Sequence, residues 1–268
     1  MFIYFLLYSL VFSSGNAAQS NLNFGSFVQS IYATNINDAI RIKYVPNETG
    51  SPVVSSYTPI SSEYRNEITF EYDVMFENGF EWVRGGKMPG LRGGDINLAT
   101  SGCVRPQPAG AWSYRPMWKP DGTVILYIYD QSRIKNNDAC GISTASEKGV
   151  LKVNQWLNFK IYMKLNSNAN LADGVAKLYV DNKLAIERKD IQFRGIYPGA
   201  TVDHIMFETF YGGHDPSWAP SKTTYAQFKN PKIYNWDLFS SDIIKNNTQA
   251  PGSYWKCGKC NSRQFAVI

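Results

Sequence analysis

Residues 113–130, SYRPMWKPDGTVILYIYD, contain a β-hairpin signal that decides the fold of the surrounding sequence. The turn lies in KPDG, residues 119–122: proline suits the first central position of a type I turn, aspartate is tolerated at the second, and glycine accepts a positive φ. A type I turn followed by a left-handed residue closes a hairpin with a three-residue loop. We therefore predict that Pro120, Asp121 and Gly122 form the loop and that Lys119 faces Thr123.

The predicted register brings four polar side chains to one face of the hairpin. Counting outward from the loop, Arg115 lies opposite Tyr127 and Ser113 lies opposite Tyr129. Directly opposed residues point to the same side of a sheet, with Cβ atoms roughly 4.5–5.5 Å apart. The other face is apolar and predicts a core side: Tyr114, Pro116, Trp118, Val124, Leu126 and Ile128. The polar face is expected to line a groove, because serine and arginine are uncommon in cores.

Period-two alternation of apolar and polar residues continues along the chain and predicts many antiparallel strands. Strands are expected at residues 68–77, 156–166, 204–213 and 228–239, and a hairpin at 176–188. No repeat, linker or long amphipathic helix divides the sequence. We therefore predict one all-β domain, residues 19–268, with the two curved antiparallel sheets and the cleft of a β-jelly roll.

The chain begins with MFIYFLLYSLVFSSGNAAQS, an apolar run followed by small residues, which is typical of a secretory signal peptide. We expect residues 1–18 to be removed and the mature protein to be secreted without a membrane anchor, because the apolar run is short. Sequons at Asn47 and Asn246 agree with glycosylation during secretion. The formal charge of +5 permits an anionic partner without requiring one.

Four cysteines in a secreted chain predict two disulfides, for which three pairings are open. Cys257 and Cys260 form a CGKC motif, but the sequence around them does not indicate the strand–helix junction of a thioredoxin-like redox site. A local bridge between these two is favoured, which leaves Cys103 to pair with Cys140. The second pair brackets the hairpin, so its bridge would clamp the hairpin at its base.

Residue patterns that several common enzyme classes need are missing. The two histidines, His204 and His214, do not lie in a nucleophile-elbow pattern, and no spacing typical of a zinc site or a phosphate-binding loop occurs. We expect neither a metal nor a cofactor. A glycosidase needs paired carboxylates. Five residues could supply them, but no spacing singles out a pair: Glu71, Asp73, Glu77, Glu81 and Glu208.

Arginine and tyrosine together suit one reaction, β-elimination on a uronic acid. Arginine neutralises the carboxylate and so acidifies the C5 proton, tyrosine takes that proton, and an acid protonates the leaving O4. In mannuronate and glucuronate the two positions are syn, so one tyrosine could perform both transfers. The alternative interpretation of the four polar residues is a solvated cross-strand ladder without catalytic function.

A second stretch, residues 76–95 (FENGFEWVRGGKMPGLRGGD), places Lys87 among five glycines and between Arg84 and Arg92. One interpretation is a loop or a bulged strand with scattered charge. The functional interpretation is a backbone that lets a polymer approach closely while three cations meet its carboxylates.

Four motifs together resemble the alginate lyases of polysaccharide lyase family 14, over residues 60–240: GGKMPGLRGG at 85–94, S-x-R at 113–115, Y-x-Y at 127–129 and TFYGGHDPSWAP at 209–220. The resemblance implies a β-jelly roll that cleaves its polymer endolytically and without metal, leaving an unsaturated uronate end. It also implies catalytic or substrate-binding roles for five matching residues: Lys87, Ser113, Arg115, Tyr127 and Tyr129. His214 and Arg92 stand where this sequence departs from the family pattern, and either could shift subsite preference.

The leading hypothesis is a secreted, monomeric lyase acting on polymannuronate-rich alginate, with an anionic polysaccharide and not nucleic acid as its partner. Tyr129 or Tyr127 acts as base and acid, with Tyr129 favoured as the base, and Arg115 and Lys87 hold the carboxylate. Ser113 orients a partner group, and Arg84, Arg92 and His214 are expected to bind substrate. A lyase for glucuronan-type chains and a non-catalytic carbohydrate-binding jelly roll are the alternatives.

Overall fold

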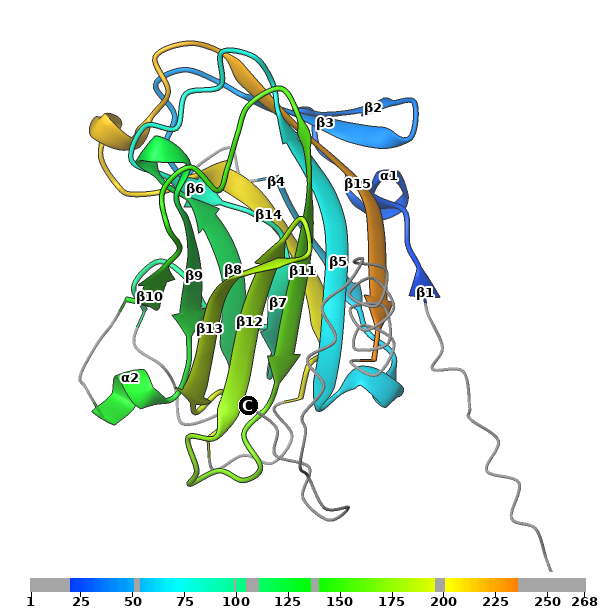
Figure 1. Cartoon of the computed structure of the whole chain (residues 1–268), viewed down its shortest axis with the longest axis vertical. Helices are drawn as coiled ribbons and strands as arrows, with labels where there is room; N and C mark the ends of the chain where they lie inside the picture. Colours follow the sequence, from blue (N-terminus) through cyan, green and yellow to red (C-terminus); the bar gives the residue numbers. More distant parts are fainter. Residues whose placement is uncertain are drawn as a thin grey trace, which may run out of the picture.

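The protein folds into two antiparallel sheets that pack against each other. The computed structural model describes residues 20–50, 54–98, 100–104, 111–135, 140–195 and 201–235. Figure 1 shows the sheets one behind the other, with β11, β12 and β13 crossing in front of β7 and β8. This arrangement is the predicted all-β jelly roll. No helix within the described ranges is long and apolar enough to cross a membrane.

One sheet has eight strands in the order β13-β12-β11-β5-β15-β3-β2, with β1 paired to β15. Its strands are β1 (Ser20–Asn21), β2 (Ala33–Ile36), β3 (Ala39–Tyr44), β5 (Glu67–Phe76), β11 (Trp156–Lys164), β12 (Gly174–Val180), β13 (Lys183–Ile191) and β15 (Thr224–Tyr234). Strands distant in the chain lie side by side, such as β5 between β11 and β15.

The other sheet has seven strands in the order β10-β9-β8-β6-β14-β4, and β7 pairs with both β14 and β8. Its strands are β4 (Val54–Pro59), β6 (Gly86–Lys87), β7 (Gly90–Gly93), β8 (Trp112–Trp118), β9 (Val124–Tyr129), β10 (Ile142–Ala145) and β14 (His204–Tyr211). The described helices are short: α1 (Phe24–Phe27), α2 (Ser132–Lys135) and the 3-10 turns η1 (Ser62–Tyr64), η2 (Pro120–Gly122) and η3 (Pro216–Trp218).

Strand β5 shows why this sequence forms a two-layer core. Its alternating residues Ile68, Phe70, Tyr72, Val74 and Phe76 are fully buried between the sheets. The rings of Tyr72 and Phe159 stack with centroids 5.6 Å apart. Burying an apolar side chain of this size stabilises the fold by roughly 1.5–3 kcal/mol, so the inward face of β5 alone contributes substantially to folding.

Most predicted strands are confirmed. The expected strands at 68–77, 156–166 and 204–213 correspond to β5, β11 and β14, and the hairpin at 176–188 corresponds to β12 and β13. Asp181 and Asn182 form the turn of that hairpin with positive φ angles of 49° and 63°. The last predicted strand was placed too late in the sequence, because β15 already begins at Thr224 and pairs there with β3.

The register predicted for the β8–β9 hairpin is confirmed, whereas its turn type is wrong. Ser113 pairs with Tyr129 and Arg115 with Tyr127, and the Lys119 N–H donates to the Thr123 carbonyl over 2.9 Å. Asp121 and Gly122 both have positive φ angles, 60° and 65°. A type I turn needs a negative φ at its second central residue, so the three-residue loop closes in another way.

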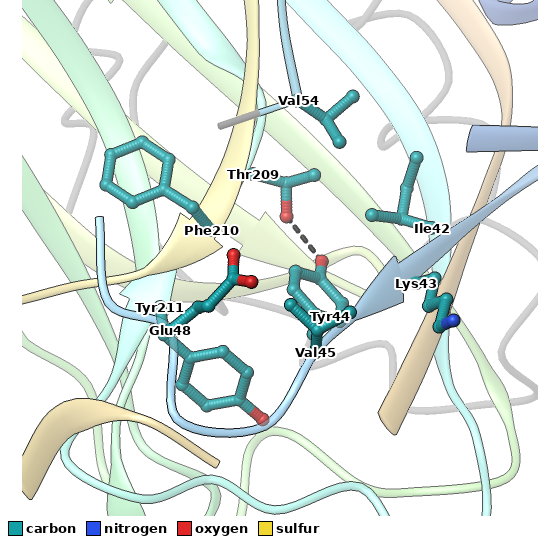
Figure 2. Close-up of a pocket in the computed structure, with 9 residues that line it drawn as sticks. All are labelled: Ile42, Lys43, Tyr44, Val45, Glu48, Val54, Thr209, Phe210 and Tyr211. Atoms are coloured by element: carbon teal, nitrogen blue, oxygen red, sulfur yellow. Dashed lines mark hydrogen bonds between the residues drawn. The ribbon is translucent and has the colours of Figure 1, made fainter. Parts of the chain in front are cut away.

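A hydrogen bond between hydroxyls ties the two sheets together. Figure 2 shows Tyr44 of β3 and Thr209 of β14, whose oxygens are 2.5 Å apart. The cavity beside them is only about 10 Å³, no larger than a single water needs, so we assign it no ligand. Burial raises the pKa of Tyr44, which therefore stays neutral in this contact.

The disulfide prediction is confirmed for Cys103 and Cys140, whose Cα atoms are 3.9 Å apart. The pairing predicted for Cys257 and Cys260 lies outside the described residues, as do the signal peptide at 1–18 and the sequon at Asn246. The other sequon residue, Asn47, is exposed.

Candidate active site

A cleft of about 690 Å³ opens on the face of the seven-stranded sheet that points away from the core. Side chains from five strands and three loops meet there. The lining residues are Gly50, Lys87, Ser101, Gly102, Cys103, Met117, Lys119, Ile125, Tyr127, Tyr129, Ser143, Glu208, Phe210, Gly212, Gly213, His214 and Trp218. Three of the five residues predicted to be catalytic, Lys87, Tyr127 and Tyr129, are therefore at the cleft surface.

The two tyrosines form a compact pair on β9. Their rings are nearly perpendicular, at 87°, with centroids 5.2 Å apart, and their hydroxyl oxygens are 3.2 Å apart. Each oxygen also accepts a backbone N–H: Cys103 donates to Tyr129 over 3.2 Å and Gly141 donates to Tyr127 over 3.1 Å. Burial and the neighbouring Tyr129 raise the pKa of Tyr127 to about 12. Tyr127 is therefore a phenol, able to donate a proton, across the physiological range.

Lys87 lies beside this pair on β6. Its Nζ is 4.1 Å from the centroid of the Tyr127 ring and donates to Met117 Sδ over 3.1 Å, a weak acceptor. Burial, together with the charge of Arg115, holds the pKa of Lys87 well below its usual range, although Glu208 acts in the opposite direction. A larger fraction of Lys87 is therefore neutral than for an exposed lysine, and a neutral amine can accept a proton.

Arg115 and Ser113 lie beneath the cleft and not at its surface. Both are fully buried. Arg115 forms a 2.5 Å ion pair with Glu208 of β14 and donates to the Thr100 carbonyl over 3.2 Å, and Ser113 donates to the same carbonyl over 2.8 Å. The predicted direct contact between Arg115 and a substrate carboxylate does not fit this geometry, because the guanidinium is already engaged within the protein.

Glu208 was considered from the sequence only as one of five possible glycosidase carboxylates, and its place beside Arg115 was missed. It lines the cleft, pairs with Arg115 and accepts the Tyr57 hydroxyl over 2.6 Å. Its signal in the sequence is a carboxylate in the mainly apolar strand HIMFETFY, but its partner is 93 residues away. Glu208 is also the single carboxylate among the described residues that line the cleft, so the paired carboxylates of a glycosidase are not found there.

The other predicted substrate-binding residues are dispersed. His214 is exposed and lines the cleft. Arg84 is exposed and donates to Ser217 over 2.8 Å, with its guanidinium 4.8 Å from the ring of the cleft residue Trp218. Arg92 is buried, donating to the Asp95 and Leu98 carbonyls, and does not reach the cleft, contrary to the prediction.

The glycine-rich stretch forms buried strands, and its glycines do not line the cleft. It supplies β6 and β7, which lie between β8 and β14. A Cβ on Gly86 would lie 2.0 Å from the Trp118 ring, and one on Gly90 would lie 2.1 Å from the Tyr114 carbonyl. These glycines allow the strands of the sheet to pack closely. The functional interpretation, in which they let a polymer approach the backbone, is therefore wrong.

These features define a β-jelly roll in which a buried amine and two phenols converge in one open cleft. Residues 35–231 match the family model described as polysaccharide lyase 14, which is well over half of the chain. The chain belongs to the polysaccharide lyase 14 family and is a polysaccharide lyase. The resemblance noted in the sequence motifs is thereby confirmed.

Solved structures agree with this fold. An alginate lyase from a Chlorella virus is 25% identical, and the match covers 81% of this chain and 98% of that one with a TM-score of 0.66. An alginate lyase from Aplysia kurodai is also 25% identical, with 81% and 90% covered and a TM-score of 0.63. A variant of alginate lyase Aly36B in complex with alginate trisaccharide is 21% identical, with 82% and 95% covered and a TM-score of 0.66. No curated protein sequence matches the chain.

Proposed function

We propose that this polysaccharide lyase is a secreted, endolytic alginate lyase that prefers polymannuronate. Its similarity to the alginate lyases from a Chlorella virus and from Aplysia kurodai, both 25% identical over about four-fifths of the chain, supports alginate as the substrate. The cleft is open and of a size suited to several sugar units, which supports attack within a chain.

The single observation that carries the proposal is the convergence of Lys87, Tyr127 and Tyr129 on one side of the cleft. β-Elimination removes the C5 proton, forms the C4–C5 double bond and breaks the bond between C4 and O4, which leaves with a proton. In mannuronate the proton and O4 lie on the same side of the ring. A base and an acid on one wall of the cleft can therefore serve both positions.

The environments of these groups support a division of roles. The lowered pKa of Lys87 leaves more of its amine unprotonated and able to take the C5 proton, and the raised pKa of Tyr127 suits a phenol that donates a proton to O4. This assignment differs from the sequence-based preference for Tyr129 as the base. Lys119 and His214, which line the cleft, are the groups we assign to the substrate carboxylates.

The proposal is tested by incubating the purified mature protein with polymannuronate, polyguluronate and glucuronan. We expect ultraviolet absorbance from the unsaturated uronate to rise fastest with polymannuronate, and viscosity to fall early, before small products accumulate. Faster cleavage of glucuronan would identify a glucuronan-type lyase. Binding without absorbance would identify a carbohydrate-binding module, and new reducing ends without absorbance would identify a glycosidase.

Secretion and oligomeric state need separate measurements. We expect a eukaryotic host expressing the full chain to release a protein that begins at Gln19, as determined by N-terminal sequencing. The released protein is expected to have the mass of a monomer in light scattering. Retention of residues 1–18 in the cell-associated protein, with none in the medium, would contradict secretion.

A further inference from the structure

The Cys103–Cys140 disulfide joins two segments that each contact one of the cleft tyrosines. On one side of the bridge, the N–H of Cys103 itself donates to Tyr129 Oη over 3.2 Å. On the other side, the N–H of Gly141, the residue after Cys140, donates to Tyr127 Oη over 3.1 Å. One covalent link therefore holds both backbone donors against the two hydroxyls.

Gly141 approaches the tyrosine rings so closely that a larger residue would displace them. A Cβ built on Gly141 would lie 2.7 Å from Cε2 of Tyr129 and 2.9 Å from Cζ of Tyr127. Real Cβ contacts are essentially never shorter than 3.0 Å, so the fit requires glycine. This contact is independent of the hydrogen bonds and points to the same conclusion, that the segment at Cys140 positions the rings.

The segment at Cys103 is also anchored at both of its ends. The Thr100 carbonyl accepts from Ser113 and Arg115, and the Val104 carbonyl accepts from Arg133 over 3.2 Å. The Cys103 backbone has a positive φ of 56°, which a non-glycine residue adopts only when its surroundings impose it. The disulfide is part of those surroundings.

The two N–H donors determine where the phenol protons point. Each tyrosine oxygen accepts one backbone N–H, and the two oxygens are 3.2 Å apart, so one hydroxyl donates to the other. The proton of the second hydroxyl is then directed elsewhere, and the cleft is the open side. A pair arranged in this way presents one proton to a substrate.

We infer that the Cys103–Cys140 disulfide positions the catalytic phenols, holding two backbone N–H groups against their oxygens so that one hydroxyl proton points into the cleft. The inference rests on the proposed function, in which these phenols take part in proton transfer. Cys103, Cys140 and Gly141 are positioning residues, because they act through the tyrosines. Breaking the bridge is expected to lower turnover while leaving the fold in place.

Four charged groups surround the tyrosines from the neighbouring elements. Lys87 of β6 lies over the Tyr127 ring, Arg133 of α2 and Arg115 of β8 lie 4.3 and 5.8 Å from the centroid of the Tyr129 ring, and Glu208 of β14 lines the same cleft. None of these four charged side chains belongs to the two residues that the disulfide joins. Reduction of the bridge therefore changes the two N–H contacts without removing a charge from the site.

The first experiment compares oxidised full-length protein with protein treated with dithiothreitol, which gives two electrons and two protons to the bridge and becomes a cyclic disulfide. We expect kcat on polymannuronate to fall by about 10- to 100-fold, the cost of misplacing a reacting group by roughly 1 Å, with KM changed less than about twofold. Reoxidation is expected to restore kcat.

Matched variants identify which bridge is responsible. C103S/C140S is expected to have the low kcat of the reduced protein and no response to dithiothreitol. C257S/C260S is expected to keep the wild-type kcat and the full response. G141A tests the ring contact with the bridge intact, and G195A is its control, because the added methyl meets only the flexible end of Gln131.

A spectroscopic measurement separates positioning from general destabilisation. In protein labelled with 13C at the tyrosine Cζ atoms, the Tyr127 and Tyr129 signals, identified from the Y127F and Y129F spectra, are expected to shift on reduction while the other tyrosine signals stay in place. Circular dichroism confirms that the fold persists.

Unchanged kcat and unchanged Tyr127 and Tyr129 signals in the reduced protein would overturn the inference, as would a wild-type kcat in G141A. If C103S/C140S does not fold, G141A and the reduced wild type decide the question. A wild-type protein without lyase activity would count against the proposed function alone, because the carbon signals report the positioning of the rings independently of turnover.

Discussion

Two tyrosine pairs in this protein have almost the same ring geometry and different surroundings. Tyr44 and Tyr211 meet edge to face between the sheets, with centroids 5.5 Å apart at 87°, and Tyr127 and Tyr129 meet in the cleft at 5.2 Å and 87°. The interior hydroxyls contact threonine hydroxyls and a backbone carbonyl: Tyr44 contacts Thr209, and Tyr211 contacts Thr224 and the Glu81 carbonyl. The cleft hydroxyls accept backbone N–H groups, and both tyrosines line the cleft.

Ring packing alone therefore does not make a tyrosine reactive. A hydroxyl whose hydrogen bonds are completed inside the protein stabilises the fold and has no proton to give. A hydroxyl that accepts N–H groups keeps its own proton for another partner. Removing a cleft hydroxyl should therefore affect turnover, and removing an interior hydroxyl should affect stability.

Removing a cleft hydroxyl should lower activity strongly in at least one of two variants while the fold persists. Y127F and Y129F are each expected to fold, and kcat is expected to fall by about 10²–10⁴-fold in at least one, the usual contribution of a general acid or base. Initial rates on polymannuronate, together with thermal unfolding curves, check this. Full activity in both variants would show that the cleft pair is as structural as the interior pair.

Removing Glu208 should affect stability strongly, because Glu208 connects the cleft to the buried Arg115. E208A leaves the fully buried Arg115 guanidinium without its ion-pair partner, which is expected to cost about 3–5 kcal/mol in the free energy of unfolding. The double variant R115M/E208L replaces both charges with apolar groups and is expected to regain most of that stability. Urea unfolding measures both values, and an E208A protein as stable as wild type would contradict the assigned contact.

Removing an interior hydroxyl should have the reverse effect of removing a cleft hydroxyl. Y44F leaves the buried Thr209 hydroxyl without its partner and is expected to lower the free energy of unfolding by about 1–3 kcal/mol, with kcat unchanged. Y44F/T209V removes both hydroxyls and is expected to recover most of the loss. A reduced kcat in folded Y44F would contradict the prediction that the interior tyrosine pair affects stability and not turnover.

The smallest effect concerns pH. The native pKa of Lys87 lies below its ordinary value of 10.5, so between these two values the unfolded chain binds the proton and the native protein does not. Stability from this group therefore increases as pH rises through that window, and is lowest below it. K87M is expected to remove this slope, which is at most about 1.4 kcal/mol per pH unit, and to be inactive. Parallel stability curves for K87M and wild type would contradict the lowered pKa.

Several features of the site were predictable because they depend on neighbouring residues. The turn at 119–122 and the alternation on either side of it determine that Ser113, Arg115, Tyr127 and Tyr129 share a face, and the register confirms this. The turn itself was less predictable in detail, because Asp121 adopts a positive φ that the predicted type I turn does not have at this position.

Other features could not be predicted because they join distant parts of the chain. Arg115 of β8 meets Glu208 of β14 because the sheet order places these two strands on either side of the short strands β6 and β7. Nothing in the sequence of β8 or β14 specifies that order. Arg92 was expected at the cleft, but its side chain is buried against the Asp95 and Leu98 carbonyls. Residue type alone did not distinguish a binding arginine from a structural one.

Local sequence patterns were sufficient to predict that the chain is all β and that its hairpin has one apolar and one polar face, and the sequence favoured the pairing of Cys103 with Cys140. Turn geometry and strand alternation act over a few residues, so a linear reading is sufficient for them. Which polar side chains reach the cleft depends instead on contacts between segments that are distant in the chain. Arg115 and Ser113 bond to the Thr100 carbonyl and do not line the cleft, whereas Lys87, Tyr127 and Tyr129 do line it, because access to the cleft depends on which distant segments pack over each position.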